Sequence, residues 1–132
     1  MTRWRRLLGA LWLLYFALRN GMRAVYYLGM IPPVWAEEGV HGPWIYLGVA
    51  ALVWALAFGA AAGLWWRSGS PAARWILGGM LLYQVHIWAH RLFLMRSPFI
   101  AGSHGFALLI SLLTLLLTIG ALGGIPLPRR RA

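Results

Sequence analysis

Four long apolar runs, separated by short segments rich in proline and glycine, dominate this sequence of 132 residues. A bilayer hydrocarbon core of about 30 Å is crossed by roughly 20 helical residues, and each run reaches that length. Proline ends a helix because its ring clashes with the preceding turn and it lacks a backbone N–H. The runs therefore predict four transmembrane helices, at about residues 7–30, 44–66, 72–94 and 105–124.

The composition also favours a lipid environment. Apolar residues make up 61% of the chain and charged residues 11%. A soluble domain of this size leaves too much of its surface in water to hide that many apolar side chains. Loops this short force neighbouring helices to run antiparallel. We therefore expect an all-α integral membrane protein, with residues 1–132 forming a single transmembrane domain, an up-down bundle of four transmembrane helices.

The distribution of arginine predicts how this bundle is oriented. All 12 basic residues are arginines, and cytoplasmic loops of membrane proteins carry an excess of positive charge. Three arginine groups fall on one side of the predicted bundle, so both termini are expected in the cytoplasm, with the chain in a prokaryotic plasma membrane. Tryptophans near both expected interfaces agree with the aromatic belt of membrane proteins. The residues are Arg3, Arg5, Arg6, Arg67, Arg74, Arg129, Arg130 and Arg131, with Trp4, Trp65, Trp66 and Trp75 on their side and Trp35 and Trp44 on the other.

Several function classes are disfavoured by the sequence. The net charge of +10 does not indicate nucleic-acid binding, because the arginines are scattered between apolar runs and form no single basic face. The absence of cysteine excludes disulfides, thiolate chemistry and Cys-ligated metal centres. Glu37 and Glu38 are the two acids of the chain, and no catalytic triad or phosphate-cradling glycine loop is present. We expect a protein that is not an enzyme.

Small residues follow one face of the second predicted helix, at Ala51, Ala55, Gly59 and Gly63. Small side chains let helix backbones approach closely where lipid supplies no hydrophobic drive for association. We interpret this stripe as a helix-packing surface. A partner within the bundle is favoured over a partner on another subunit, and both remain open.

The most informative feature is a pair of arginines, Arg19 and Arg23, near the middle of the first predicted helix. A charge at that depth costs at least about 2.5 kcal/mol unless it reaches water or a partner. No acid lies in the four predicted helices, so the counter-charge must be Glu37 or Glu38 folding back, a carboxylate of another subunit, a lipid or cofactor anion, or water. A tilt or a break of the helix at Gly21 would instead bring Arg19 to the surface.

A second polar group lies on the third predicted helix. His86 and His90 share a face because they are four residues apart. With the first and third helices parallel and a rise of about 1.5 Å per residue, Arg23 lies between these histidines in height. This register predicts a basic cavity in the outward half of the bundle, lined by the first, third and fourth helices. The expected lining residues are Arg19, Asn20, Arg23, Tyr83, Gln84, His86, His90, Ser111 and Thr114.

Simpler roles are open for several of these side chains. Ser111 and Thr114 can bond to their own helix backbone, and Arg91 can extend to the membrane surface. Two histidines on one helix cannot provide opposite axial ligands to one haem, and no carboxylate or thiolate completes a metal site. We therefore expect hydrogen-bonded histidines and no metal, haem or other pigment as cofactor.

The leading functional hypothesis is a small accessory or scaffolding subunit of a larger membrane complex. It would dock through the small-residue face of the second helix and through Arg19 and Arg23, with membrane lipids and other membrane subunits or a second copy as partners. The alternative is a module that binds or transports an anion, a lipid or a quinone-like ligand in an outward-facing basic cavity. A cofactor-binding electron-transfer component is a third and weaker hypothesis.

Overall fold

The computed structural model describes residues 1–123, and within them the chain is helical without a β-strand. The expectation of an all-α fold is confirmed. The long helices match the four apolar runs. The third predicted range, 72–94, is divided between α4 and a π-helical turn that follows it. The expected end of the fourth helix at Gly124, and Arg129 to Arg131, lie outside the described residues. The elements are α1 (Arg3–Gly29), α2 (Val34–Glu37), α3 (Trp44–Ser68), a 3₁₀ turn η1 (Ser70–Ala72), α4 (Ala73–Ala89), a π-helical turn η2 (His90–Leu94), α5 (Pro98–Gly102) and α6 (His104–Ala121).

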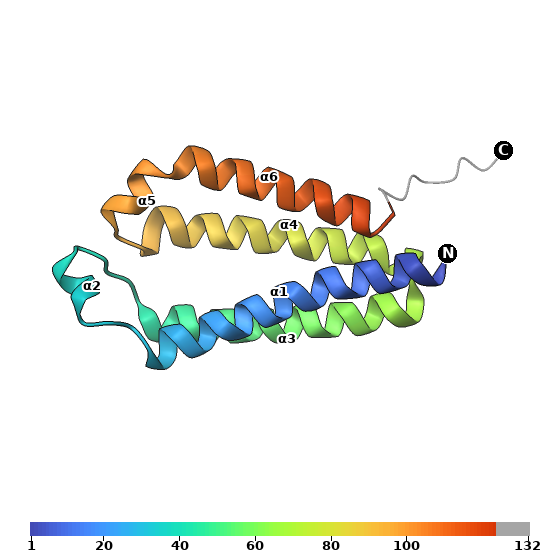
Figure 1. The fold of residues 1–132 in the computed structure, drawn as a ribbon, viewed down its shortest axis with the longest axis horizontal. Coiled ribbons are helices and arrows are strands. Elements are labelled where there is room, and N and C mark those ends of the chain that lie inside the picture. Colours follow the sequence, from blue (N-terminus) through green and yellow to red (C-terminus); the bar gives the residue numbers. More distant parts are fainter. Residues whose placement is uncertain (124–132) are drawn as a thin grey trace.

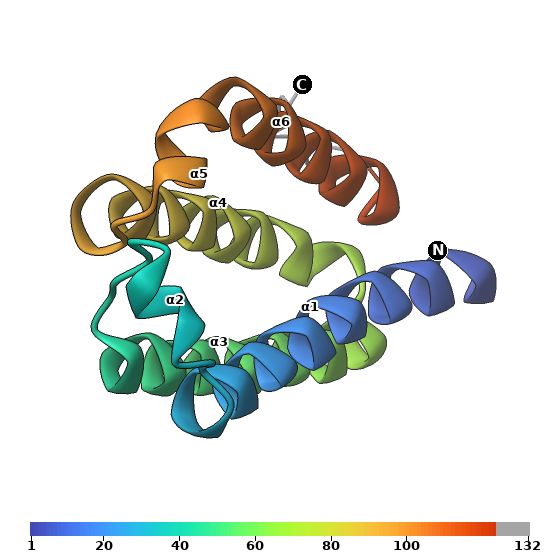
Figure 2. The ribbon, with the colours of Figure 1, turned by 60° about the vertical axis from the view of Figure 1, so that its left-hand side comes forward.

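The four long helices lie side by side and alternate in direction, with α1 beside α3 and α4 beside α6 (Figure 1). The short helices α2 and α5, which the sequence did not predict, lie at the end of the bundle away from the N-terminus (Figure 2). Proline begins each of these segments, at Pro33 before α2 and Pro98 in α5, where its fixed φ suits a first helical turn.

Two helices, α3 and α6, are long and apolar enough to cross a membrane. The other two long helices differ from them in sequence. Arg19 and Arg23 interrupt the apolar stretch of α1, and α4 has 17 residues before it passes into η2. The coarse fold is thus an all-helical bundle that contains two membrane-capable helices.

The core lies between α1, α3 and α4. Phe16 of α1 stands 5.2 Å from Phe58 of α3 and 6.0 Å from Tyr83 of α4, measured between ring centroids. Trp65 of α3 is fully buried, and its indole Nε1 donates to the backbone oxygen of Arg6 at 3.1 Å. Trp65 therefore belongs to the core. The sequence-based placement of Trp65 in the interfacial aromatic belt is wrong, because its side chain is fully buried.

The small-residue stripe of the second predicted helix packs only in part. Ala51 is buried and Ala55 half-buried, whereas a Cβ added at Gly59 or Gly63 would meet nothing within 4 Å. A spacing of four residues drifts about 40° around the helix per step, so the stripe leaves the contact. Ala51 thus packs within the bundle while Gly59 and Gly63 do not, because the buried face of α3 follows alternating spacings of three and four. Its buried residues are Leu47, Gly48, Ala51, Phe58, Ala62 and Trp65.

Close approach of α1 and α3 depends on two other glycines. A Cβ at Gly48 of α3 would lie 2.5 Å from Cγ of Leu28, and a Cβ at Gly9 of α1 would lie 2.2 Å from Nε1 of Trp65. Glycine lets the two backbones approach where any larger side chain would collide. These contacts hold α1 and α3 together as the most closely packed pair of the bundle.

Candidate functional site

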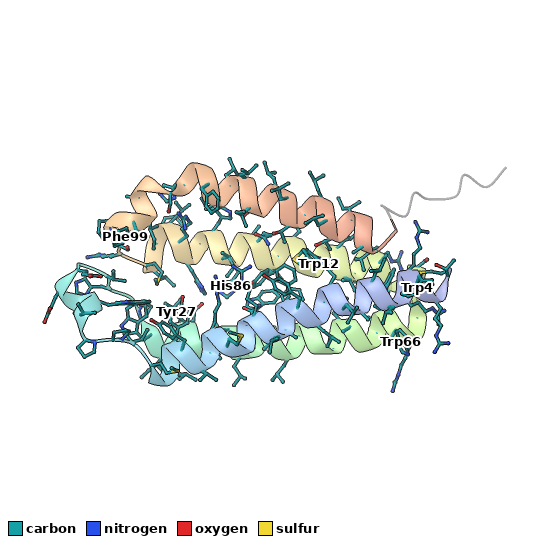
Figure 3. All side chains as sticks on the ribbon, viewed as in Figure 1. Trp4, Trp12, Tyr27, Trp66, His86 and Phe99 are labelled. Atoms are coloured by element: carbon teal, nitrogen blue, oxygen red, sulfur yellow. The ribbon has the colours of Figure 1, made fainter. Side chains whose placement is uncertain are left out.

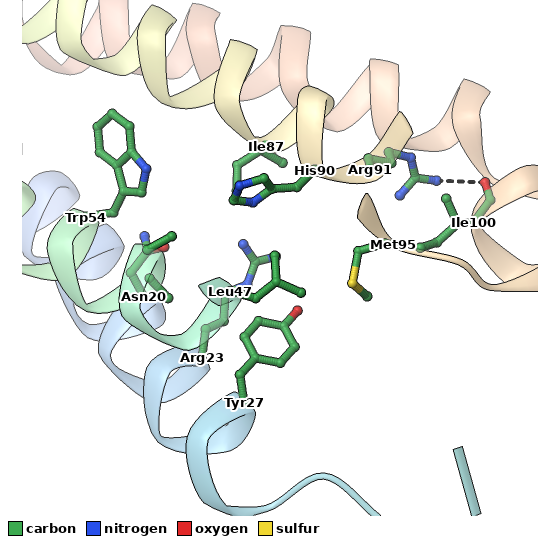
Figure 4. Close-up of a pocket in the computed structure, with 12 residues that line it drawn as sticks. Asn20, Arg23, Tyr27, Leu47, Trp54, Ile87, His90, Arg91, Met95 and Ile100 are labelled. Atoms are coloured by element: carbon green, nitrogen blue, oxygen red, sulfur yellow. Dashed lines mark hydrogen bonds between the residues drawn. The ribbon is translucent and has the colours of Figure 1, made fainter. Parts of the chain in front are cut away.

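A cavity of about 180 Å³ lies at the end of the bundle where α1, α3, η2 and α5 meet (Figure 4). Its polar lining comes from Asn20, Arg23 and Tyr27 of α1 and from His90 and Arg91 of η2. Apolar side chains of α3, Trp54 among them, complete the wall together with Ile87, Met95 and Ile100. Two cations and a histidine thus line this space, and no acidic residue of the described chain does so.

Arg23 places a positive charge in the wall of the cavity. Its side chain is half-buried, and it makes no hydrogen bond or ion pair with residues 1–123. Figure 4 shows its guanidinium pointing into the cavity on the side of His90. Within a low-dielectric site an unpaired cation attracts an anion much more strongly than in water.

Arg19 lies in a different environment from Arg23, although the two are one helical turn apart. It lines an open groove of about 500 Å³ along α1, beside Tyr15, Tyr26 and Trp35, and not the cavity, whereas Arg23 lines both. Arg19 likewise has no hydrogen bond or ion pair within the described part of the chain. The helix α1 is continuous from Arg3 to Gly29, so it is not broken at Gly21.

The acids of the chain do not neutralise these arginines in the structure. Glu37 ends α2 and Glu38 follows it, both side chains are exposed, and neither lies within 4 Å of an arginine nitrogen among residues 1–123. Of the four counter-charges that the sequence allows, folding back of Glu37 or Glu38 is therefore not observed.

Asn20 and Tyr83 form a buried polar pair between α1 and α4. The Nδ2 of Asn20 donates to the backbone oxygen of Phe16 at 2.9 Å and to the Tyr83 hydroxyl at 3.1 Å. The Tyr83 hydroxyl donates to Oδ1 of Asn20 at 3.2 Å. Both side chains are almost completely buried, so the pair holds α1 and α4 in register below the cavity, and Tyr83 does not line it.

The two histidines belong to a hydrogen-bonded cluster with α3. Nε1 of Trp54 donates to Nδ1 of His86 at 2.7 Å. The hydroxyl of Tyr46 lies 3.3 Å from Nε2 of His86 and 3.2 Å from Nε2 of His90. Within this cluster, His90 lines the cavity and His86 does not. Sequence reasoning missed Tyr46 and Trp54, and the available signal was two hydrogen-bonding aromatic residues eight apart in an apolar helix.

Arg91 is anchored within the bundle. Its Nε donates to Nδ1 of His104 at 3.1 Å, and its Nη2 donates to the backbone oxygen of Ile100 at 3.1 Å and to the hydroxyl of Ser103. These contacts tie η2 to the segment between α5 and α6. These acceptors lie at the end of the bundle, and the expectation that Arg91 extends to the membrane surface stays a prediction.

The polar residues of α6 do not line the cavity. Trp88 of α4 donates to the hydroxyl of Ser111 at 2.9 Å. The hydroxyl of Thr118 donates to the backbone oxygen of Thr114 at 2.7 Å and accepts a hydrogen bond from Trp12 of α1 at 2.9 Å. The placement of Ser111 and Thr114 in the cavity wall is thus wrong, because α6 packs against α4 and α1 while α3 occupies the position across from His90.

Gln84 also lies away from the cavity. It is buried and makes no side-chain hydrogen bond within residues 1–123. Its spacing of four and seven from Trp88 and Arg91 places it on the α4 face that turns toward α6. Of the nine expected lining residues, the cavity brings together Asn20, Arg23 and His90, while Arg19, Tyr83, Gln84, His86, Ser111 and Thr114 lie elsewhere.

Two loops close the end of the bundle next to the cavity. His41 and Arg96 exchange backbone hydrogen bonds of 2.7 and 2.8 Å, which joins the segment before α3 to the segment before α5. Met95, the neighbour of Arg96, lines the cavity. Figure 3 shows Tyr27 and Phe99 toward this end, His86 near the middle, and Trp4 and Trp66 at the opposite end.

No group of three or more potential metal-ligating residues occurs in the part of the chain that the structure describes. Comparison with models of known protein families, with curated proteins and with solved structures found no match. Function is therefore argued from the geometry of the cavity and of the groove along α1.

Proposed function

We propose that the chain is an integral membrane protein whose four long helices all cross the bilayer, with both termini in the cytoplasm of a prokaryotic cell. Large apolar side chains on each of these helices support the proposal. Leu18 of α1 is 66% exposed, Leu56 of α3 68%, Leu82 of α4 61% and Leu116 of α6 64%. Soluble monomers rarely expose apolar surface this continuously, whereas lipid solvates it.

The proposed topology places Arg23 within the hydrocarbon. Phe16 is the middle residue of α1, and Arg23 is seven residues further along, about 10 Å from the centre at the usual helical rise. Half of a hydrocarbon core measures about 15 Å. A cation at that depth is stable when it meets water or an anion, so the cavity that surrounds Arg23 is suited to supply one of these.

The proposed function is the binding of an anionic ligand in this cavity, as a membrane-embedded binding or transport module. The observation that carries it is the unpaired guanidinium of Arg23 in a cavity shared with Arg91 and His90 and lined by no acid of the described chain. Basic pockets between transmembrane helices bind anionic head groups in this way.

Isothermal titration calorimetry of the purified protein in a neutral detergent tests this function. Titration with inorganic phosphate is expected to give saturable binding at one site per chain, and titration with choline is expected to give none. Equal heats from the two probes would contradict an anion site. The flux of phosphate into liposomes then separates a transporter from a binding module.

A second candidate function is favoured by Arg19. It lines an aromatic groove along α1, and it lacks an anionic partner among residues 1–123. An accessory subunit that docks a partner helix carrying an intramembrane carboxylate accounts for this placement. The small residues Gly59 and Gly63, which have open space around them, offer a further contact surface to a second subunit.

Co-purification from a mild detergent tests the second function. Arg19→Ala is expected to release the partner subunit, and replacing the partner's carboxylate by the amide is expected to do the same. Arg74→Ala, at an exposed arginine of α4 that does not line this groove, is the control and should leave the complex intact. Retention of the partner by Arg19→Ala, or its release by Arg74→Ala as well, would contradict docking through Arg19.

A further inference from the structure

The hydrogen bond between Trp54 and His86 fixes where His86 carries its proton. An indole nitrogen is a donor and cannot accept, and Nε1 of Trp54 lies 2.7 Å from Nδ1 of His86. Nδ1 therefore accepts and carries no hydrogen. His86 is then a neutral imidazole, with its hydrogen on Nε2.

The hydrogen on Nε2 of His86 in turn orients the hydroxyl of Tyr46. Nε2 donates to the Tyr46 oxygen across 3.3 Å. The hydroxyl's own hydrogen then has Nε2 of His90, at 3.2 Å, as the acceptor within reach. In the arrangement in which Tyr46 donates to His90, the hydroxyl both accepts and donates, and the ring hydrogen without a partner among residues 1–123 is the one on His90, which lines the cavity.

This direction of hydrogen bonding decides what His90 offers to the cavity. Since Nε2 of His90 accepts from Tyr46, the ring hydrogen of a neutral His90 lies on Nδ1. His90 is buried and lines the cavity, and Nδ1 makes no hydrogen bond within residues 1–123. The imidazole thus has one donor to offer to a ligand and no free acceptor.

We propose that the oriented chain from Trp54 through His86 and Tyr46 makes His90 a hydrogen-bond donor, so that the cavity selects a phosphate group. This inference rests on the proposed anion-binding function and deepens it. Arg23 and Arg91 also donate and cannot accept, so the charged and histidine groups of the wall all match the acceptor oxygens of a phosphate group. Trp54, His86 and Tyr46 are positioning residues, because they act through His90.

The size of the cavity limits the ligand to a compact one. Its volume of about 180 Å³ corresponds to the liquid volume of roughly six water molecules. This is enough for a phosphate group with its first substituent. The phosphate can be free or part of a lipid head group, because both present the same oxygens to Arg23 and His90.

Nitrogen NMR of histidine-labelled protein in nanodiscs tests the direction of the chain. The wild type is expected to show His86 with its hydrogen on Nε2 and His90 with its hydrogen on Nδ1. Tyr46→Phe removes the hydroxyl that donates to Nε2 of His90. The fraction of His90 with its hydrogen on Nδ1 is then expected to fall. Tyr15→Phe, an exposed tyrosine of α1, is the matched control and should leave both spectra unchanged. A wild-type His90 with its hydrogen on Nε2 would overturn the inference.

Phosphate binding by the same variants tests the consequence for the ligand. Tyr46→Phe is expected to weaken binding about fivefold, the effect of one neutral hydrogen bond, while Tyr15→Phe leaves affinity unchanged. Inorganic phosphate and dihexanoyl phosphatidic acid are the two probes, and the one that binds more tightly identifies the source of the phosphate group. Wild-type affinity in Tyr46→Phe, with binding still lost in Arg23→Gln, would overturn the inference and leave the proposed function standing. Absence of binding to both probes in the wild type would overturn the proposed function together with it.

Discussion

The hydroxyl of Tyr83 lies between the two polar atoms of the Asn20 amide, 3.2 Å from Oδ1 and 3.1 Å from Nδ2. The two residues belong to α4 and α1, and both are nearly inaccessible. This contact joins the closely packed pair of α1 and α3 to α4 directly below the basic cavity. The position of Arg23 relative to His90 therefore depends on it.

Removing one member of this pair is expected to destabilise the bundle. Asn20→Leu leaves the Tyr83 hydroxyl buried without its partner, at a cost of about 1–3 kcal/mol. Tyr83→Phe is expected to cost a similar amount. The double variant should cost less than the sum of the two, because removing both partners of a buried hydrogen bond is nearly neutral. Unfolding of the purified protein in detergent measures all three, and additive effects would show that the two side chains do not interact.

Gly9 is expected to be the glycine of α1 that tolerates substitution least. A Cβ there would lie 2.2 Å from Nε1 of Trp65, which is fully buried and held by its hydrogen bond to Arg6. Gly9→Ala should therefore cost about 1–3 kcal/mol through overpacking. Gly21→Ala on the same helix is the control, since a Cβ there meets nothing within 4 Å. It should be neutral or stabilising by up to about 1 kcal/mol. Equal effects of the two variants in the same unfolding assay would refute the α1–α3 packing.

The contact between α1 and α6 is expected to depend on Thr118. This residue is completely buried and accepts a hydrogen bond from Trp12 at 2.9 Å. Thr118→Val keeps the shape but leaves the indole N–H without an acceptor, and we expect a loss of about 1 kcal/mol, as is usual for interhelical hydrogen bonds in membranes. Thr118→Ser retains the hydroxyl and serves as the control. A loss of stability in Thr118→Ser as large as that in Thr118→Val would show that the methyl group, and not the hydrogen bond, matters.

The proposed topology predicts which loops are accessible from outside the cell. The chain has no cysteine, so single cysteines can be introduced without background. Glu38→Cys, in the exposed segment after α2, should react with a membrane-impermeant maleimide in intact cells. Ser68→Cys, exposed at the end of α3, should react only after permeabilisation. The reverse labelling pattern would place the termini outside, and labelling of both from outside would rule out the four-span arrangement.

Much of the fold follows from apolar run length and from proline. These features predicted the positions of the four long helices within a few residues, and the rise per residue predicted that Arg23 and His90 lie at a similar height. Run length carries no information on lateral packing, and so α6 was assigned the position that α3 occupies beside His90. The partners of His86 were missed for the same reason, because Tyr46 and Trp54 reach it from a helix distant in sequence.

The sequence also could not predict that Arg23 lines the cavity while Arg19 does not. A spacing of four residues predicts a shared helix face, yet the faces of α1 are divided between the cavity and the groove at this point. The groove contains both arginines, and the cavity contains Arg23 without Arg19.

Calorimetric titration of two matched variants with inorganic phosphate tests the central claim most directly. Arg23→Gln and Arg19→Gln each remove one positive charge from α1, one turn apart, and so change the net charge equally. If the cavity is the anion site, Arg23→Gln weakens phosphate binding at least tenfold and Arg19→Gln leaves it within about twofold of the wild type, since charged hydrogen bonds are worth about 1.5–3 kcal/mol. Equal loss in both variants, or wild-type affinity in Arg23→Gln, would contradict the assignment of the cavity.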